Sequence, residues 1–318
     1  MQLAIIGLGR MGKNMAQRLI KDGHKIIGYD QSAPACAELI SYGAQTVSSL
    51  AQLKQLLKPP RIAWIMVPHG KAVDGVISEL SQAFSVGDII IDGANSHFID
   101  SVSRHQDLEK IGITFIDIGV SGGVFGLERG YCLMAGGDQK AVDYIEPILA
   151  SLSPGEGASP PTANRHKHDS CAHRGFYYCG KSGSGHYVKM VHNAIEYGLM
   201  QSYAEGFELL KNADYDFDLK EISELWRRGS VVGSWLLDLL AHALHKDPSL
   251  SSFTGHVPDS GEGRWALMEA IKQNTPTPNL ANALFTRFRS RQESSLAEKS
   301  LSALRAEFGG HAEASNKA

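Results

Sequence analysis

The chain of 318 residues has little that would support a metal centre, a disulfide framework or a membrane anchor. It has four cysteines, none in a Cys-x-x-Cys pair or at metal-ligand spacing, which indicates reduced thiols in a cytoplasmic protein. They are Cys36, Cys132, Cys171 and Cys179. The apolar run at residues 2–6 is far too short for a membrane span and leads directly into a glycine motif. We therefore expect no metal and no membrane partner.

The chain also lacks an excess of either charge. It has 34 acidic and 31 basic residues, a formal net charge of −3, which gives no support for binding to nucleic acid or to a membrane surface. A hydrophobic content of 43% and a charged content of 20% are typical of a globular protein. The length predicts about two domains.

Hydrophobic patterning divides the chain into two parts. Strands are expected at 2–6, 25–29, 62–67, 88–92, 114–118 and 131–136, and helices between them at 10–22, 34–41, 71–83, 98–110 and 139–151. From about residue 183 only helical patterns follow, at 183–212, 218–228, 234–246, 278–291 and 295–308. The predicted fold is an α/β Rossmann-type doubly wound sheet in residues 1–178, followed by an all-α C-terminal domain in residues 179–318.

The segment 153–175 is rich in proline, glycine and polar residues, without periodicity, and we interpret it as a flexible insertion loop. Its four potential metal ligands have no regular spacing or structured frame, so a flexible loop is favoured over a metal site. These are His166, His168, Cys171 and His173. The tail 309–318 is also expected to be disordered.

A glycine fingerprint predicts a dinucleotide site at the first joint between strand and helix. Gly7 allows the tight turn, Gly9 lets a pyrophosphate approach the backbone, and Gly12 lets helix and strand pack closely. The helix N-terminus attracts the anion. The expected cofactor-binding residues of this loop are Gly7, Leu8, Gly9, Arg10, Met11 and Gly12.

Asp30 ends the second predicted strand, where the adenine ribose of the cofactor should lie. A carboxylate there accepts hydrogen bonds from the ribose hydroxyls of NAD and would repel the 2′-phosphate of NADP. The alternative is that Asp30 caps the following helix. We expect NAD to be the cofactor, with NADP less favoured.

The stretch "GHYVKMVHNAIEYG" at 185–198 predicts a helix that is apolar except for one stripe. Its polar residues fall within an arc of about 140°. They are Lys189, His192, Asn193, Glu196 and Tyr197. An amphipathic helix with a wet polar face is one alternative. We favour a buried helix whose acid–base residues meet a ligand.

Together, these motifs resemble the 6-phosphogluconate dehydrogenase family, in a short form. The resemblance lies in "GLGRMGKNMAQRL", "IMVPHG", "IDGANS", "GVSGGVFGLERGYCLMAGG", "GSGHYVKMVHNAIEYG", "DSGEGRW" and "LFTRFRSR". It implies oxidative decarboxylation of 6-phosphogluconate to ribulose 5-phosphate and CO₂ in the pentose phosphate pathway. The phosphorylated sugar acid would be the small-molecule partner, and the chain would form a homodimer or homotetramer.

The resemblance also implies residue roles. Lys189 would be the general base and acid, and Glu196 the second acid. Asn95, Ser121, Gly122, Gly123, His192, Asn193 and Tyr197 would hold the substrate, and Arg264 and Arg287 its phosphate. Val67, Pro68, His69 and Asn95 would border the nicotinamide. Arg264 stands where the family usually has a lysine. Longer members place an arginine and a histidine from a C-terminal tail in the partner's site, an arrangement for which this chain is too short.

The expected chemistry suits these residues. Burial favours a neutral lysine amine, which can take the proton of a hydroxyl and return one to the ketone oxygen. Lys189 and Glu196 are two helical turns apart on one face, about 10 Å along the axis, which suits acids at different ends of a short carbon chain. Two alternatives remain: another β-hydroxyacid dehydrogenase, of the 3-hydroxyisobutyrate or tartronate semialdehyde type, and a non-catalytic nucleotide sensor.

Overall fold

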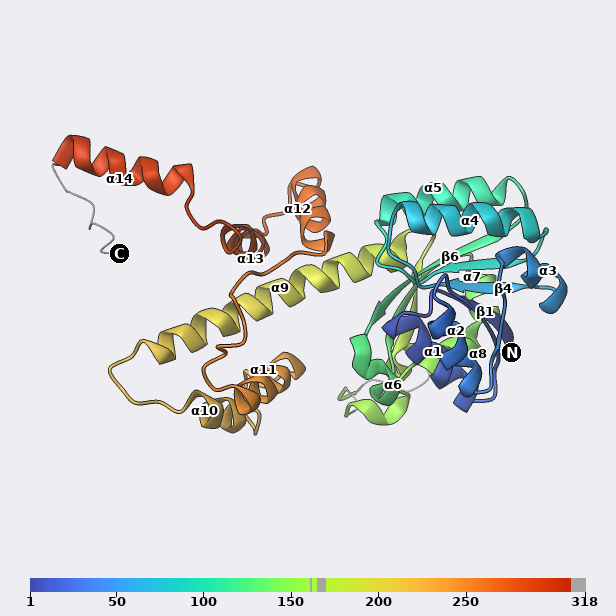
Figure 1. Cartoon of the computed structure of the whole chain (residues 1–318), viewed down its shortest axis with the longest axis horizontal. Helices are drawn as coiled ribbons and strands as arrows, with labels where there is room; N and C mark the ends of the chain where they lie inside the picture. Colours follow the sequence, from blue (N-terminus) through green and yellow to red (C-terminus); the bar gives the residue numbers. More distant parts are fainter. Residues whose placement is uncertain (161, 165–169, 310–318) are drawn as a thin grey trace. The chain divides into compact units, whose positions relative to one another are not determined.

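The computed structural model describes residues 1–160, 162–164 and 170–309 (Figure 1). The chain forms two compact units, Met1–His192 and Asn193–Ala318. Their boundary falls inside one long helix, α9 (Ser184–Lys211), so this helix contributes residues to both units. The sequence patterns had suggested a boundary between residues 178 and 179, ahead of this helix.

The first unit contains an eight-stranded sheet with the order β3-β2-β1-β4-β5-β6-β7-β8. The strands are β1 (Gln2–Ile6), β2 (Lys25–Tyr29), β3 (Gln45–Thr46), β4 (Ile62–Ile65), β5 (Ile89–Asp92), β6 (Thr114–Ser121), β7 (Cys132–Gly137) and β8 (Phe176–Gly180). Only β6 and β7 pair antiparallel. All six expected strands are present. β3 was missed because two residues show no periodicity, and β8 because it directly follows the aperiodic segment.

Helices cover both faces of the sheet, which confirms the doubly wound prediction. They are α1 (Arg10–Lys21), α2 (Ala33–Ser41), α3 (Leu53–Leu56), α4 (Lys71–Ala83), α5 (Phe98–Glu109), α6 (Gly126–Arg129), α7 (Gln139–Tyr144) and α8 (Glu146–Leu152). Leu3 and Ile5 of β1 join the core beneath α1 and α8. Ala4 and Ile6 join the core beneath α4 and α5 on the opposite face (Figure 1). A parallel strand buried on both faces is apolar at every position.

The segment interpreted as a flexible loop is tied at its base. Ser153 is buried, and the Gly155 N–H donates to the Arg174 carbonyl at 3.0 Å. Residues 161 and 165–169, which include His166 and His168, lie outside the described part of the chain. No group of three or more histidine, cysteine or acidic side chains among the described residues could hold a metal ion. Within the same residues, no helix is long and apolar enough to cross a membrane.

The second unit is entirely helical over its described residues, up to 309. After α9 come α10 (Leu219–Trp226), α11 (Trp235–Lys246), α12 (Glu262–Lys272), α13 (Pro278–Arg289) and α14 (Leu296–Gly309). α10 packs against α11, and α12 against α13. The sequence patterns missed α12. Gly261 immediately precedes this helix and Gly263 lies in its first turn, and glycine weakens a helical pattern.

Two residues of β6 attach the start of α9 to the sheet. The fully buried Asp117 accepts hydrogen bonds from the Gly183 N–H at 2.6 Å and the His186 N–H at 2.9 Å. These donors belong to the N-terminal turn of α9, which has no intrahelical partners for them. Two residues further along β6, a side chain on Gly119 would overlap Cβ of Lys189. The helix therefore rests directly on β6, with Lys189 at the contact.

We predict that Asp117→Asn lowers the free energy of unfolding by about 1.5–3 kcal/mol, because one amide nitrogen would then face a backbone donor. Denaturant unfolding measures the change. Asp138→Asn is the matched control: Asp138 is exposed and accepts from the Ala141 N–H at 2.9 Å as the N-cap of α7. Asparagine caps helices about as well as aspartate, so this control should change little. Equal effects in both variants would contradict the role assigned to Asp117.

Candidate active site

The predicted cofactor residues gather at one edge of the sheet. The glycine loop follows β1, Val67 to His69 follow β4, Asn95 follows β5, and Ser121 ends β6. These four strands are parallel, so their carboxyl ends share an edge. The connections run in opposite directions on the two sides of β1, to β2 and to β4. Such a switch point is where open α/β sheets bind ligands.

The glycine loop has the geometry that a dinucleotide needs. Gly7 has a φ of 92°, and a Cβ there would lie 2.6 Å from the Met66 carbonyl oxygen. A Cβ on Gly12 would overlap the Gly7 carbonyl. Beside Gly9, at the N-terminus of α1, a Cβ would meet no atom within 4 Å. That open space lets an anion reach the helix N-terminus, so these residues fit the pyrophosphate of a dinucleotide.

Asp30 joins the glycine loop to Ser32, the residue that caps the helix after it. Its Oδ2 accepts from the Leu8 N–H at 2.6 Å, and its Oδ1 from the Ser32 N–H at 2.7 Å. The N-cap of α2 is Ser32, whose hydroxyl accepts from the Ala35 N–H. The alternative role for Asp30, as a helix cap, is therefore wrong. Each carboxylate oxygen keeps capacity to accept a further hydrogen bond.

A buried ion pair supports the turn that carries Asn95. Asp92 is fully buried at the end of β5, and its Oδ2 accepts from Arg104 Nη1 at 2.9 Å and from the Ser96 hydroxyl at 2.8 Å. Asp92 Oδ1 accepts from the Ala94 N–H at 3.0 Å. Sequence reasoning missed Asp92 and Arg104. The available signal was a carboxylate at the end of an otherwise apolar strand.

At the end of β6, Ser121 and His192 come together, with 3.1 Å between Ser121 Oγ and His192 Nε2. Burial raises the pKa of the Cys132 thiol, and the nearby Lys189 ammonium opposes that shift. Cys132 pairs with Ser121 across β6 and β7. Lys189, 8% exposed, therefore lies at the same end of β6 as Ser121. Gly122 and Gly123, with φ of 131° and 55°, form the turn that follows.

In the second unit, α9 meets the "GEGRW" motif. Asn193 Nδ2 donates to Glu262 Oε1 at 2.9 Å, and both side chains are buried. The Tyr197 hydroxyl lies 3.1 Å from Ser260 Oγ. The Arg287 guanidinium stacks on the Tyr197 ring, 3.5 Å from its centroid. Glu196, one residue before Tyr197, is half-buried.

Two arginines of the second unit, Arg264 and Arg291, share the carboxylate of Asp259. Arg264 binds both oxygens of Asp259, at 2.8 and 3.0 Å, and Arg291 binds Oδ2 at 2.8 Å. These contacts, chiefly that of Arg264, hold the pKa of Asp259 well below its usual range. Arg287 donates to the neighbouring Pro258 carbonyl at 2.9 Å. Arg289, which lies between Arg287 and Arg291 in the sequence, pairs with Glu298.

The apolar arc of α9 differs from expectation. We expected this arc to be buried, yet Val188, Ile195 and Leu199 are 41%, 52% and 46% exposed. The covered side joins part of the polar arc, Lys189 and Asn193, to the adjoining apolar residues Met190 and Ala194, all of them buried. The expectation of a helix buried all round is therefore wrong for a single chain. Tertiary contacts, rather than hydropathy, decide which face is covered.

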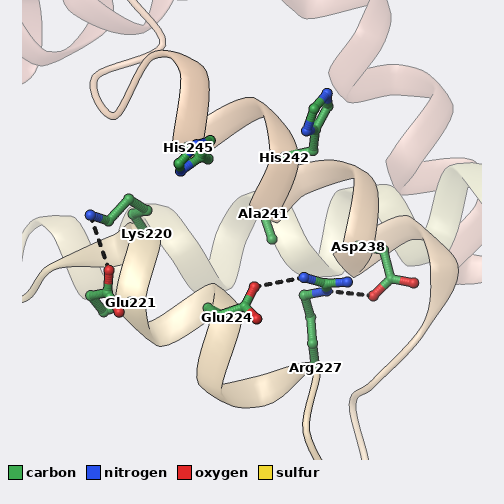
Figure 2. Close-up of a pocket in the computed structure, with 8 residues that line it drawn as sticks. All are labelled: Lys220, Glu221, Glu224, Arg227, Asp238, Ala241, His242 and His245. Carbon is green, nitrogen blue, oxygen red and sulfur yellow. Dashed lines mark hydrogen bonds and ion pairs between the residues drawn. The ribbon is translucent and has the colours of Figure 1, made fainter.

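A cleft of about 350 Å³ lies between α10 and α11, and none of the predicted site residues lines it (Figure 2). Its charged residues mostly satisfy one another: Arg227 bridges Glu224 and Asp238, and Lys220 pairs with Glu221. His242 and His245 also line it. Neither Lys189 nor the glycine loop contributes, so this cleft is not the active-site candidate.

Comparisons with known proteins identify the family to which both parts of the chain belong. Residues 2–162 match the NAD binding domain of 6-phosphogluconate dehydrogenase, and residues 185–317 match the C-terminal domain of 6-phosphogluconate dehydrogenase. The chain is 40% identical to YqeC of Bacillus subtilis (strain 168) over 312 residues, covering 98% of this chain and 99% of YqeC.

Two further relatives are similar over nearly the whole chain. The NAD(+)-dependent, decarboxylating 6-phosphogluconate dehydrogenase of Haloferax volcanii is 39% identical over 312 residues, 98% of each chain. The structure of Plasmodium falciparum 6-phosphogluconate dehydrogenase matches with a TM-score of 0.82 and 29% identity, covering 100% of this chain and 67% of that one. On the strength of both matched domains and these full-length similarities, the chain belongs to the 6-phosphogluconate dehydrogenase family.

Proposed function

We propose that this chain oxidises 6-phosphogluconate at C3 and releases CO₂ to leave ribulose 5-phosphate, with NAD as the hydride acceptor. The observation that carries the proposal is the position of Lys189, a buried lysine held at the contact of α9 with β6 beside Ser121 and His192. NAD bound at the carboxyl edge of the sheet would accept the hydride.

The residues of α9 divide the proton transfers between two groups. Lys189 takes the C3 hydroxyl proton as the hydride leaves C3, which gives a β-keto acid. The same group then donates a proton to the C3 oxygen while the C1–C2 bond breaks and CO₂ departs. Glu196, two turns further along the same face of α9, protonates the enediol carbon that lost CO₂. Ser121, His192 and Asn193 orient the carboxylate and hydroxyl groups.

The phosphate end of the substrate would meet Tyr197 and the arginines. Arg287 already stacks on Tyr197 and donates a hydrogen bond to the Pro258 carbonyl. Arg264 and Arg291 bind the next residue, Asp259. Three guanidinium groups against two carboxylates, Asp259 and Glu262, leave one positive charge in excess. A dianionic phosphate suits that excess, and guanidinium groups bind phosphate bidentately. A substrate without a phosphate would gain no binding energy from this positive charge. The charge therefore disfavours a dehydrogenase of the 3-hydroxyisobutyrate or tartronate semialdehyde type.

We predict that Lys189→Ala lowers kcat by ~10²–10⁴-fold, because it removes the general base and acid. Titration should show that NAD still binds. Lys211→Ala, at the exposed far end of the same helix, is the matched control and should keep full activity. A Lys189→Ala enzyme that turns over as fast as this control would rule out the assignment.

We predict a preference for NAD over NADP of at least about tenfold in kcat/KM, equivalent to about 1.4 kcal/mol. The reason is that Asp30 would face the 2′-phosphate. Two like charges about 4 Å apart repel by roughly 1 kcal/mol in water and about 4 kcal/mol at an effective dielectric of 20. Asp30→Asn combined with Gln31→Arg should narrow or reverse the preference. Kinetics favouring NADP in the unmodified protein would overturn this cofactor assignment without touching the catalytic one.

We propose that the chain assembles into a homodimer or homotetramer through its helical part. Large apolar side chains stand exposed there: Leu209, Ile271 and Phe285 are 76%, 77% and 57% exposed, in addition to the apolar arc of α9. Exposed apolar surface of this extent marks an interaction site. Sedimentation should give a mass of two or four chains, and Ile271→Lys with Phe285→Lys should lower it. A wild-type protein that sediments as a single chain at assay concentration would refute this. The cytoplasmic location stays a prediction.

A further inference from the structure

Glu262 is a buried carboxylate to which the proposed mechanism gives no role. It is the first residue of α12 and only 2% exposed. Its Oε1 accepts from Asn193 Nδ2 at 2.9 Å, while its Oε2 is buried and makes no hydrogen bond among the described residues. Burying a carboxylate with one oxygen unpaired is costly, and an amide or hydroxyl could bond Asn193 at a smaller desolvation cost. A purely structural role therefore does not account for a carboxylate here.

The two glycines around Glu262 bring it to α9. Gly261, with a φ of 100°, is the N-cap of α12. A Cβ on Gly263 would lie 2.9 Å from the Tyr197 ring. Asn193 and Tyr197 are four residues apart and share one face of α9. Consecutive residues of α12 thus contact successive turns of that face, Glu262 at Asn193 and Gly263 at Tyr197.

The pairing determines which end of the Asn193 amide faces which way. An ionised carboxylate only accepts hydrogen bonds, whereas an amide donates through its nitrogen and accepts through its oxygen. Glu262 therefore holds Nδ2 towards itself and turns Oδ1 away. A side-chain amide with neutral surroundings could adopt either orientation, because its two ends have nearly the same shape.

We propose that Glu262 is a positioning residue that makes Asn193 an acceptor towards the substrate. This inference rests on the proposed function, in which Asn193 contacts the sugar acid. An acceptor oxygen binds a hydroxyl of the polyol chain, which has a proton to donate. It does not bind a carboxylate or ketone oxygen, which has none. The pair would thereby select a chain with a hydroxyl at this position and reject one with a carbonyl there.

A kinetic test exchanges the donor and the acceptor in the hydrogen bond between Asn193 and Glu262. Asn193→Asp places two carboxylates together and should lower kcat/KM for 6-phosphogluconate by more than ~10-fold. Adding Glu262→Gln restores a donor opposite an acceptor, with residue 193 still offering an oxygen to the substrate. The double variant should regain at least ~10-fold over Asn193→Asp, with the KM for NAD unchanged. In the matched control, Asn193→Asp with Glu262→Leu, the repulsion is relieved without a donor, and kcat/KM should stay low.

A second measurement does not depend on turnover. In the apo protein with ¹⁵N-labelled asparagine, the side-chain NH₂ of Asn193 should be protected from solvent exchange. Glu262→Leu, which leaves no acceptor for that NH₂, should lower the protection by at least ~10-fold. Glu269→Gln, two turns along the same helix, where Glu269 bonds Gln273, should leave it unchanged.

The two measurements separate the two claims. Protection that survives Glu262→Leu would overturn the positioning role, whatever the enzyme's substrate. Equal kcat/KM in Asn193→Asp alone and in Asn193→Asp combined with Glu262→Gln would overturn it for an enzyme that does oxidise 6-phosphogluconate. Loss of protection in a protein that shows no activity on 6-phosphogluconate would support the pairing and refute the proposed function instead.

Discussion

The contact between α9 and β6 is the constraint on which the rest of the site depends. Asp117 holds the first backbone donors of the helix, and Gly119 leaves no side chain between the strand and Lys189. A larger residue at position 119 would lift the helix away from the sheet. The predicted cofactor residues lie at the carboxyl edge of that same sheet, so the contact sets where the Lys189 amine stands relative to them. A displacement of about 1 Å in such a geometry can cost ~10²-fold in rate.

α9 also contains candidate site residues from both units of the chain. Lys189 and His192 belong to the unit that contains the glycine loop, while Asn193, Glu196 and Tyr197 belong to the helical unit with the arginines. A single continuous helix keeps these residues at fixed spacing, whatever else moves. Its apolar arc is exposed in the single chain, which supports the proposed assembly.

Most of the architecture could be predicted from the sequence, because the strand and helix patterns of the first unit are both strong. Doubly apolar strands separated by amphipathic helices can form little else than a covered parallel sheet. Two strands escaped because β3 is too short for a pattern and β8 follows an aperiodic stretch. α12 escaped because glycines flank its first residue, and one of them, Gly263, leaves room for the close approach to Tyr197.

Candidate site residues with a chemical signature stand out in the sequence, whereas the residues that hold them do not. Lys189 stands out as a lysine on a largely apolar helix, and the glycine loop by its spacing. Glu262, Asp259 and Arg104 act by holding other side chains, and no local pattern distinguishes such a residue from a solvated charge. Only the three-dimensional pairing shows that Asp92, Asp117 and Glu262 are buried.

The most direct test of the account is the stoichiometry of the wild-type reaction. With 6-phosphogluconate labelled at C1 and NAD in excess, the account predicts one labelled CO₂ trapped for each NADH formed, with ribulose 5-phosphate as the remaining product. NADH formation without labelled CO₂ would show that Lys189 and Glu196 do not complete the decarboxylation. Absence of NADH with this substrate, in an enzyme that binds NAD, would contradict the account at its centre.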